Sequence, residues 1–153
     1  MEHIELRRQA TSLSWTGWRR WKKSGSRGNP GPAAIGVHVV NADGKMLMQV
    51  AETIGNATNN YAEYWAVVRA LQAAKEHFGK RTDDIQFVLK LDSELVKKQL
   101  NNEYQIKEPG LVPLFIEIHN MRVASFPNLI FIHLSREQNK EADMLVNQAL
   151  DAA

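Results

Sequence analysis

The chain has 153 residues, which is the size of one domain. Hydrophobic residues make up 44% and charged residues 24%, an ordinary globular composition that excludes global disorder. Cysteine is absent, which excludes disulfides, thiolate zinc sites and cysteine nucleophiles and favours a reducing, cytoplasmic compartment. No apolar run approaches the roughly 20 residues that span a membrane, and no signal peptide is evident, so we expect no membrane association.

The net charge of +2 conceals an uneven distribution of charge along the chain. Residues 1–28 carry seven basic and two acidic side chains, a net charge of +5, whereas residues 29–153 carry a net charge of −3. A basic segment beside an acidic body indicates a polyanion as partner, although basic tails that only increase solubility have the same pattern.

The first 27 residues contain Trp15, Trp18 and Trp21 at every third position, with basic residues between them. This spacing is closer to one face of a helix than to a strand, in which residues on one face differ by two. Three interpretations remain open. The first is an edge strand, from about residue 13, or a short helix whose indoles cover the sheet. The second is a nucleic-acid arm in which indoles stack on bases, and the third is a membrane-surface helix.

From residue 28 onward, turn residues divide the chain into well-separated elements. Glycine and proline predict a stiff turn at 28–32, and Asp-Gly predicts a hairpin turn within 41–45. A polar loop at 55–60 precedes a long Ala- and Leu-rich helix that ends at Gly79. We expect strands at 35–40, 46–54, 85–91 and 129–134, and helices at 61–78, 94–100, 112–123 and from about 139 to 150. This order predicts an α/β protein with a mixed sheet.

Three carboxylates stand where such a sheet would bring them together. Glu63 lies in the first turns of the long helix, Asp92 follows an apolar strand, and Asp143 lies near the start of the last helix. Sites in open α/β sheets form at strand ends and adjacent helix starts. Clustered acids repel one another, and the usual reason to assemble them is a hard cation such as Mg²⁺. Any one of them alone would only be an acid favoured by the helix dipole.

Four motifs closely resemble type 1 ribonuclease H, in that family's order and at its spacing. They are Ser-Arg-Gly-Asn-Pro-Gly-Pro at 26–32, Thr-Asn-Asn-Tyr-Ala-Glu at 58–63, Leu-Asp-Ser-Glu-Leu-Val at 91–96 and Arg-Glu-Gln-Asn-Lys-Glu-Ala-Asp at 136–143. The resemblance covers about residues 26–150, in the short form that lacks a basic insertion after Asp92. It implies a five-stranded mixed sheet flanked by helices. It also implies hydrolysis of the RNA strand of RNA/DNA hybrids with two Mg²⁺ or Mn²⁺ ions.

The resemblance also implies roles for individual residues. Three of the family's four metal-binding, catalytic carboxylates correspond to Glu63, Asp92 and Asp143. Arg136 takes the place of a catalytic histidine loop, with a role on a phosphate or in product release, and His133 is interpreted as structural. Substrate contacts are implied for Asn29, Asn60 and Glu94 in the minor groove and for Thr58 and Asn59 at phosphates.

One position departs from the family pattern. The first motif of the family begins with a metal-bridging Asp, and counting back from Asn29 places Lys23 there. A lysine cannot ligate a metal and repels it. Three explanations are open: a relative that kept the fold and lost the chemistry, a Lys23 that partly replaces the metal's charge, or a shifted reading frame before about Ser26.

We therefore predict a ribonuclease H-like domain at 23–153, preceded by a divergent basic segment at 1–22. Its partner would be an RNA/DNA hybrid or another nucleic acid, and we expect a monomer. The enzyme class implied is a hybrid-specific endoribonuclease, with activity left open by the missing carboxylate. The alternative is a catalytically inactive hybrid- or RNA-binding module of the same fold, and a weaker alternative is a purely structural interaction domain.

Overall fold

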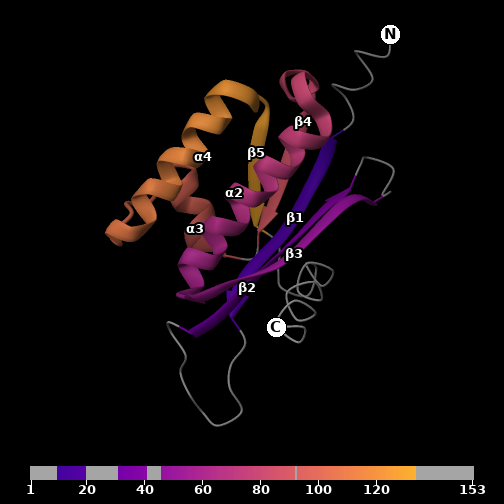
Figure 1. The fold of residues 1–153 in the computed structure, drawn as a ribbon. Coiled ribbons are helices and arrows are strands. Elements are labelled where there is room, and N and C mark those ends of the chain that lie inside the picture. Colours follow the sequence, from indigo (N-terminus) through magenta and orange to yellow (C-terminus); the bar gives the residue numbers. More distant parts are fainter. Residues whose placement is uncertain (1–9, 20–30, 41–45, 92, 134–153) are drawn as a thin grey trace.

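The computed structural model describes residues 10–19, 31–40, 46–91 and 93–133 (Figure 1). Its strands are β1 (Ala10–Arg19), β2 (Gly31–Val40), β3 (Met46–Ala57), β4 (Gln86–Leu91) and β5 (Leu129–His133). Its helices are α2 (Asn59–Phe78), α3 (Glu94–Leu100) and α4 (Val112–Ser125), with short 3₁₀ turns η1 (Gly79–Asp83) and η2 (Pro109–Leu111). The predicted turn at 41–45 and the predicted last helix lie outside the described residues.

The five described strands form one mixed sheet in the order β3-β2-β1-β4-β5. β1, β2 and β3 pair antiparallel, whereas β1, β4 and β5 run parallel. The predicted α/β class and five-stranded mixed sheet are therefore confirmed. The parallel half brings the C-terminal ends of β1, β4 and β5 to the same edge, which is where sites of open sheets form.

The first strand corrects two parts of the sequence interpretation. β1 lies at the centre of the sheet between β2 and β4, with Trp15 opposite Val37 and Leu13 beside Leu89, so it is neither an edge strand nor a helix. A central strand gains hydrogen bonds along both edges, and this tertiary gain outweighs the helix-like spacing of the tryptophans. The strand begins at Ala10 instead of about residue 13. Trp21 lies outside the described residues.

Two strands are longer than predicted because they include residues expected in loops. β2 begins at Gly31, so Gly31 and Pro32 pair with β3 instead of completing a turn. β3 continues through Gly55 to Ala57, and a register shift between Ala33 and Ala34 accommodates the positive φ of 77° at Gly55. A glycine in a strand often marks such an irregularity.

The described helices lie together on one face of the sheet (Figure 1). Alternate residues of β4 and β5 are buried, namely Phe87, Leu89, Leu91, Leu129 and Phe131. Phe87 packs edge-to-face between Phe78 at the end of α2 and Phe126 after α4, with ring centroids 5.5 and 5.2 Å apart. This core fixes α2 across the sheet and so determines where its first turn lies.

The residues that flank the long helix α2 explain where it begins and ends. Thr58 is the N-cap, and its Oγ1 accepts a hydrogen bond from the Tyr61 amide at 3.1 Å. The helix begins at Asn59, two residues before the predicted start, and ends at Gly79, whose φ of 59° suits glycine. Within the described part of the chain, no helix is long and apolar enough to cross a membrane.

Candidate nucleic-acid and metal site

The structure describes about half of the predicted site. It places Thr58, Asn59, Asn60, Glu63 and Glu94, all at the starts of α2 and α3. The other candidates lie outside the described residues: Lys23, Asn29, Asp92, Arg136 and Asp143. The convergence of the three predicted carboxylates therefore stays a prediction. Among the residues that are described, no group of three or more acidic, histidine or cysteine side chains could hold a metal.

Glu63 lies one turn into α2 and is only 6% exposed. Its chain neighbours Ala62 and Tyr64 are fully buried. A glutamate is rarely buried to this extent unless its carboxylate is paired or coordinates a metal, because removing the charge from water is costly. This acid is thus held in place by the core, unlike Glu76, the exposed glutamate near the other end of the same helix.

The first turns of α2 are tied to α3 by a buried hydrogen bond. The Tyr64 hydroxyl donates to Oε1 of Gln99 at 2.6 Å, and the Gln99 amide in turn donates to the carbonyl oxygen of Gln105 at 3.5 Å. Burial raises the pKa of the Tyr64 phenol well above its usual range, with a smaller contribution from the negative charge of Glu108. Tyr64 is therefore a neutral donor at physiological pH, and it holds the helix of Glu63 against α3.

The start of α3 lies where β4 ends. β4 ends at Leu91, and Ser93 caps α3 by accepting a hydrogen bond from the Val96 amide at 3.2 Å. Gln99 in the last turn of α3 contacts the first turns of α2, so the helix that follows Asp92 in the chain lies against the helix of Glu63. A site shared by Glu63 and Asp92 stays a prediction.

Glu94 is exposed in the first turn of α3 and forms an ion pair with Lys98 at 3.1 Å. The hydrogen bond and charge of Lys98 lower the pKa of Glu94, and the charge of His133 lowers it further. Lys98 also lies 4.8 Å from the centre of the Tyr104 ring. α3 also contacts β5, which ends at His133, so the ends of β4 and β5 and the start of α3 gather at this edge.

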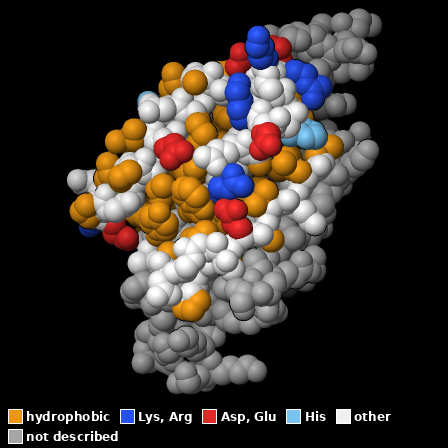
Figure 2. All heavy atoms as spheres, in the orientation of Figure 1, with side chains coloured by type: hydrophobic (Ala, Val, Ile, Leu, Met, Phe, Trp, Pro, Cys, Tyr) orange, Lys and Arg blue, Asp and Glu red, His pale blue; other side chains and the backbone are white. Residues whose placement is uncertain are grey.

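The helix-bearing face is not a basic surface. Figure 2 shows acidic and basic side chains interspersed there among gathered apolar side chains. Several large apolar residues are exposed on the described part of the chain, including Leu95, Tyr104, Val112 and Ile116. Among the described residues of this face, basic side chains are thus accompanied by acidic ones.

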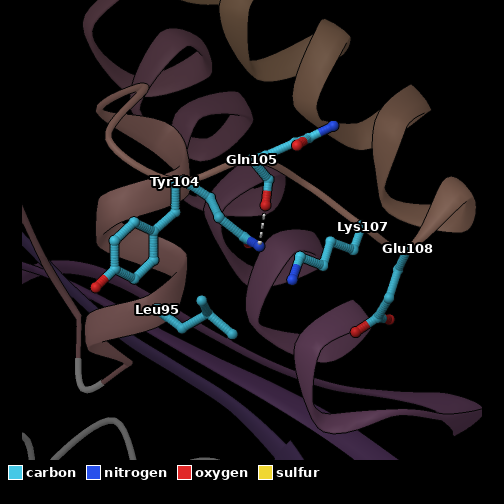
Figure 3. A pocket seen from close by; sticks show the side chains of 6 residues that line it. Leu95, Tyr104, Gln105, Lys107 and Glu108 are labelled. Atoms are coloured by element: carbon cyan, nitrogen blue, oxygen red, sulfur yellow. Dashed lines mark hydrogen bonds between the residues drawn. The ribbon is translucent and has the colours of Figure 1, made fainter.

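Sequence reasoning missed the contribution of the segment between α3 and α4. Residues 104–108 border a cavity of about 500 Å³ lined by Leu95, Gln99, Tyr104, Gln105, Lys107 and Glu108 (Figure 3). The Asn60 side chain donates to Oε1 of Glu108 at 2.9 Å, across 48 residues of sequence. No local pattern in one sequence predicts a contact at this separation, so Glu108 could not be found without the fold.

Comparisons with known proteins agree with this geometry. A family model described as reverse transcriptase-like matches residues 23–149. A ribonuclease HI of Halobacterium salinarum is 43% identical over 128 residues, which are 84% of this chain and 61% of that protein. The crystal structure of LC11-RNase H1, isolated from compost by a metagenomic approach, is 38% identical with a TM-score of 0.80 over 94% of this chain and 96% of that one. The sheet order and the acid at the start of α2 thus define a ribonuclease H-like α/β protein.

The crystal structure of RNase H1 from Halobacterium salinarum has a TM-score of 0.79 at 36% identity, covering 94% of this chain and 99% of that one. The chain belongs to the reverse transcriptase-like family and, within it, to the type 1 ribonucleases H. It spans about 61% of the length of the curated Halobacterium relative. LC11-RNase H1 has also been crystallised in complex with an RNA/DNA hybrid, at the same TM-score of 0.80.

Proposed function

We propose that the chain binds RNA/DNA hybrids at the start of α2 and hydrolyses their RNA strand, with activity far below that of relatives that carry all four carboxylates. The observation that carries this proposal is the arrangement of Thr58 to Glu63 on a capped helix start fixed to α3. The hybrid complex of LC11-RNase H1, a close structural neighbour, supports the choice of substrate.

The helix start supplies the groups that hold the duplex. The first amides of a helix and its dipole attract anions, so we assign a backbone phosphate to the segment of Thr58 and Asn59. Asn60 and Glu94 face the minor groove in this proposal, together with Asn29. Such a duplex is recognised by its A-like shape and its 2′-hydroxyls, with little dependence on base sequence.

The donor set of this edge fits a hard divalent cation. Glu63 is a nearly buried carboxylate, and carboxylate oxygens are the ligands that Mg²⁺ and Mn²⁺ prefer. We assign Glu63, Asp92 and Asp143 as ligands. Two bound ions supply an activated water and stabilise the leaving oxygen in this type of hydrolysis. Arg136 is assigned to the phosphate or to product release.

Lys23 favours a second candidate function. If Lys23 occupies the position of the bridging acid, its positive charge offsets one of the three carboxylates, so we expect at most one metal site and little cleavage. The chain would then act as a hybrid- or RNA-binding module that uses the same helix start.

Cleavage and binding of a labelled RNA/DNA hybrid in Mg²⁺ or Mn²⁺ separate these functions. We expect weak cleavage by the native chain and its loss in Glu63→Gln, which removes a charge without changing the shape of the side chain. Glu76→Gln is the matched control, because Glu76 is exposed near the far end of the same helix. Binding without cleavage by the native chain identifies the binding module. Equal affinity for the hybrid and for a DNA duplex would contradict both functions.

A further inference from the structure

Glu108 holds a residue of the proposed duplex site from outside that site. Its carboxylate accepts a hydrogen bond from Nδ2 of Asn60 at 2.9 Å. The backbone of Glu108 is fixed, because Pro109 follows it and the Leu111 amide donates to its carbonyl oxygen at 3.0 Å. Figure 3 shows Glu108 at the edge of the cavity, apart from Tyr104 and Leu95. The carboxylate therefore approaches the start of α2 from a rigid turn.

This contact determines which end of the Asn60 amide faces outward. An ionised carboxylate only accepts hydrogen bonds, so the end of the amide that contacts Glu108 must be the NH₂ group. The carbonyl oxygen Oδ1 is then directed away from Glu108 and is available as an acceptor. Without Glu108, either end of the amide could face a ligand.

An outward acceptor suits only some nucleic acids. The minor groove of an RNA-containing duplex presents 2′-hydroxyl groups, which can donate a hydrogen bond. The minor groove of A·T pairs in DNA presents acceptors alone, and only guanine adds a donor there. An Asn60 with a fixed acceptor thus matches an RNA strand and mismatches most DNA.

The charge of Glu108 acts in the same direction. Its influence reaches the buried Tyr64, whose pKa it helps to raise. A negative charge beside the start of α2 repels every phosphate backbone, so a duplex binds well only when it makes compensating contacts. The acceptor on Asn60 provides one such contact for RNA.

We propose that Glu108 is a specificity-determining residue that positions Asn60 as an acceptor and so favours RNA/DNA hybrid over DNA duplex. This inference rests on the proposed hybrid binding. Glu108 acts through Asn60, and it does not itself contact the substrate.

The test compares affinities for a hybrid and a DNA duplex of the same sequence, by fluorescence anisotropy at several salt concentrations. In Glu108→Ala we expect tighter binding of the DNA duplex and a fall of about fivefold in the hybrid-to-DNA affinity ratio, the effect of one hydrogen bond. Glu108→Gln keeps an oxygen within reach of Asn60 and should retain part of the ratio. The control is Glu103→Gln, which removes the same charge from the same exposed segment.

An unchanged ratio in Glu108→Ala would overturn the inference, and so would an equal fall in Glu103→Gln, since that result requires only long-range charge. The positioning contact is tested separately without nucleic acid, from the side-chain amide NMR signals of Asn60, assigned with Asn60→Asp. These signals should shift in Glu108→Ala and stay in place in Glu103→Gln. If the native chain bound neither duplex but the Asn60 signals still shifted in Glu108→Ala, only the proposed function would be refuted. If the Asn60 signals did not shift in Glu108→Ala, the role of Glu108 would be refuted.

Discussion

The start of α2 and the strand β1 are positioned by different kinds of interaction, one local and one between distant segments. The helix start follows from local residues, because Thr58 caps it by accepting a hydrogen bond from the Tyr61 amide. β1 follows from pairing with β2 and β4 on its two sides, against the helix-like spacing of its tryptophans. The comparison teaches that the residues at the start of α2 can be predicted from motifs, whereas the residues that β1 brings to the edge of the sheet depend on its register.

The largest expected effect on hybrid cleavage comes from the register of β1. The parallel pairing of β1 with β4 is described as far as Ser14 opposite Lys90, and Thr16 lies two residues further along β1, toward the edge at which β4 ends. β1 ends at Arg19, four residues before Lys23. We therefore expect Thr16→Asp to increase hybrid cleavage about a hundredfold, the usual effect of a group at the reacting centre.

Lys23→Asp is the partner variant in this experiment. It restores activity only if residues 13–22 form the first strand in the family's register, whereas the structure places the strand at Ala10–Arg19. We expect no recovery of cleavage in this variant, measured on the same labelled hybrid in Mg²⁺. Recovery in Lys23→Asp but not in Thr16→Asp would mean that the motif, and not the sheet, determines the register.

A medium effect should follow from breaking the tie between α2 and α3. Tyr64→Phe leaves the buried Oε1 of Gln99 without its donor, and an unsatisfied buried acceptor costs about 1–3 kcal/mol. We expect a loss of this size in the free energy of unfolding, measured with urea. Tyr61→Phe serves as the control because Tyr61 is 37% exposed and no hydrogen bond of its hydroxyl is among those found in the described structure. Equal losses in the two variants would argue against a special role for the buried bond.

The smallest effect concerns pH at the start of α3. The pKa of Glu94 is lowered from 4.5 by Lys98, so the folded chain holds this proton less tightly than the unfolded chain does. The resulting stabilisation is present above about pH 4.5 and is lost as the pH falls through the lower folded pKa. NMR titration should show the Glu94 midpoint below 4.5 in the native chain and closer to it in Lys98→Met. High salt should weaken the difference, because Glu94 is exposed and Lys98 is partly exposed.

Much of the fold was predictable because its boundaries carry strong local signals. The stop at Gly79, the bounds of α3 and the apolar strand before Asp92 were each predicted to within one residue. The central position of β1 was not, since backbone hydrogen bonds to two neighbours leave no mark on the strand's own side chains. Its three-residue tryptophan spacing even indicated the wrong element.

The site was predictable where one short segment holds its residues together. Thr58 to Glu63 share a cap and a turn and a half of helix, so motif and geometry coincide. Glu108 contacts Asn60 from 48 residues away, and only the packing of α2 against the segment before α4 brings them together. A contact of this kind depends on the whole fold and carries no spacing that a single sequence could reveal.

The packing of aromatic rings at the C-terminal end of α2 has a consequence for the proposed binding of a duplex at its N-terminal end. The helix is 20 residues long, roughly 30 Å, and it is fixed at one end by Phe78 against Phe87 and near the other by Tyr64. A helix that is packed against the core at both ends does not tilt to fit a bound duplex. In the proposed complex the helix start therefore keeps its position, so the nucleic acid must adjust its groove width, and a duplex that adjusts only at high cost binds weakly.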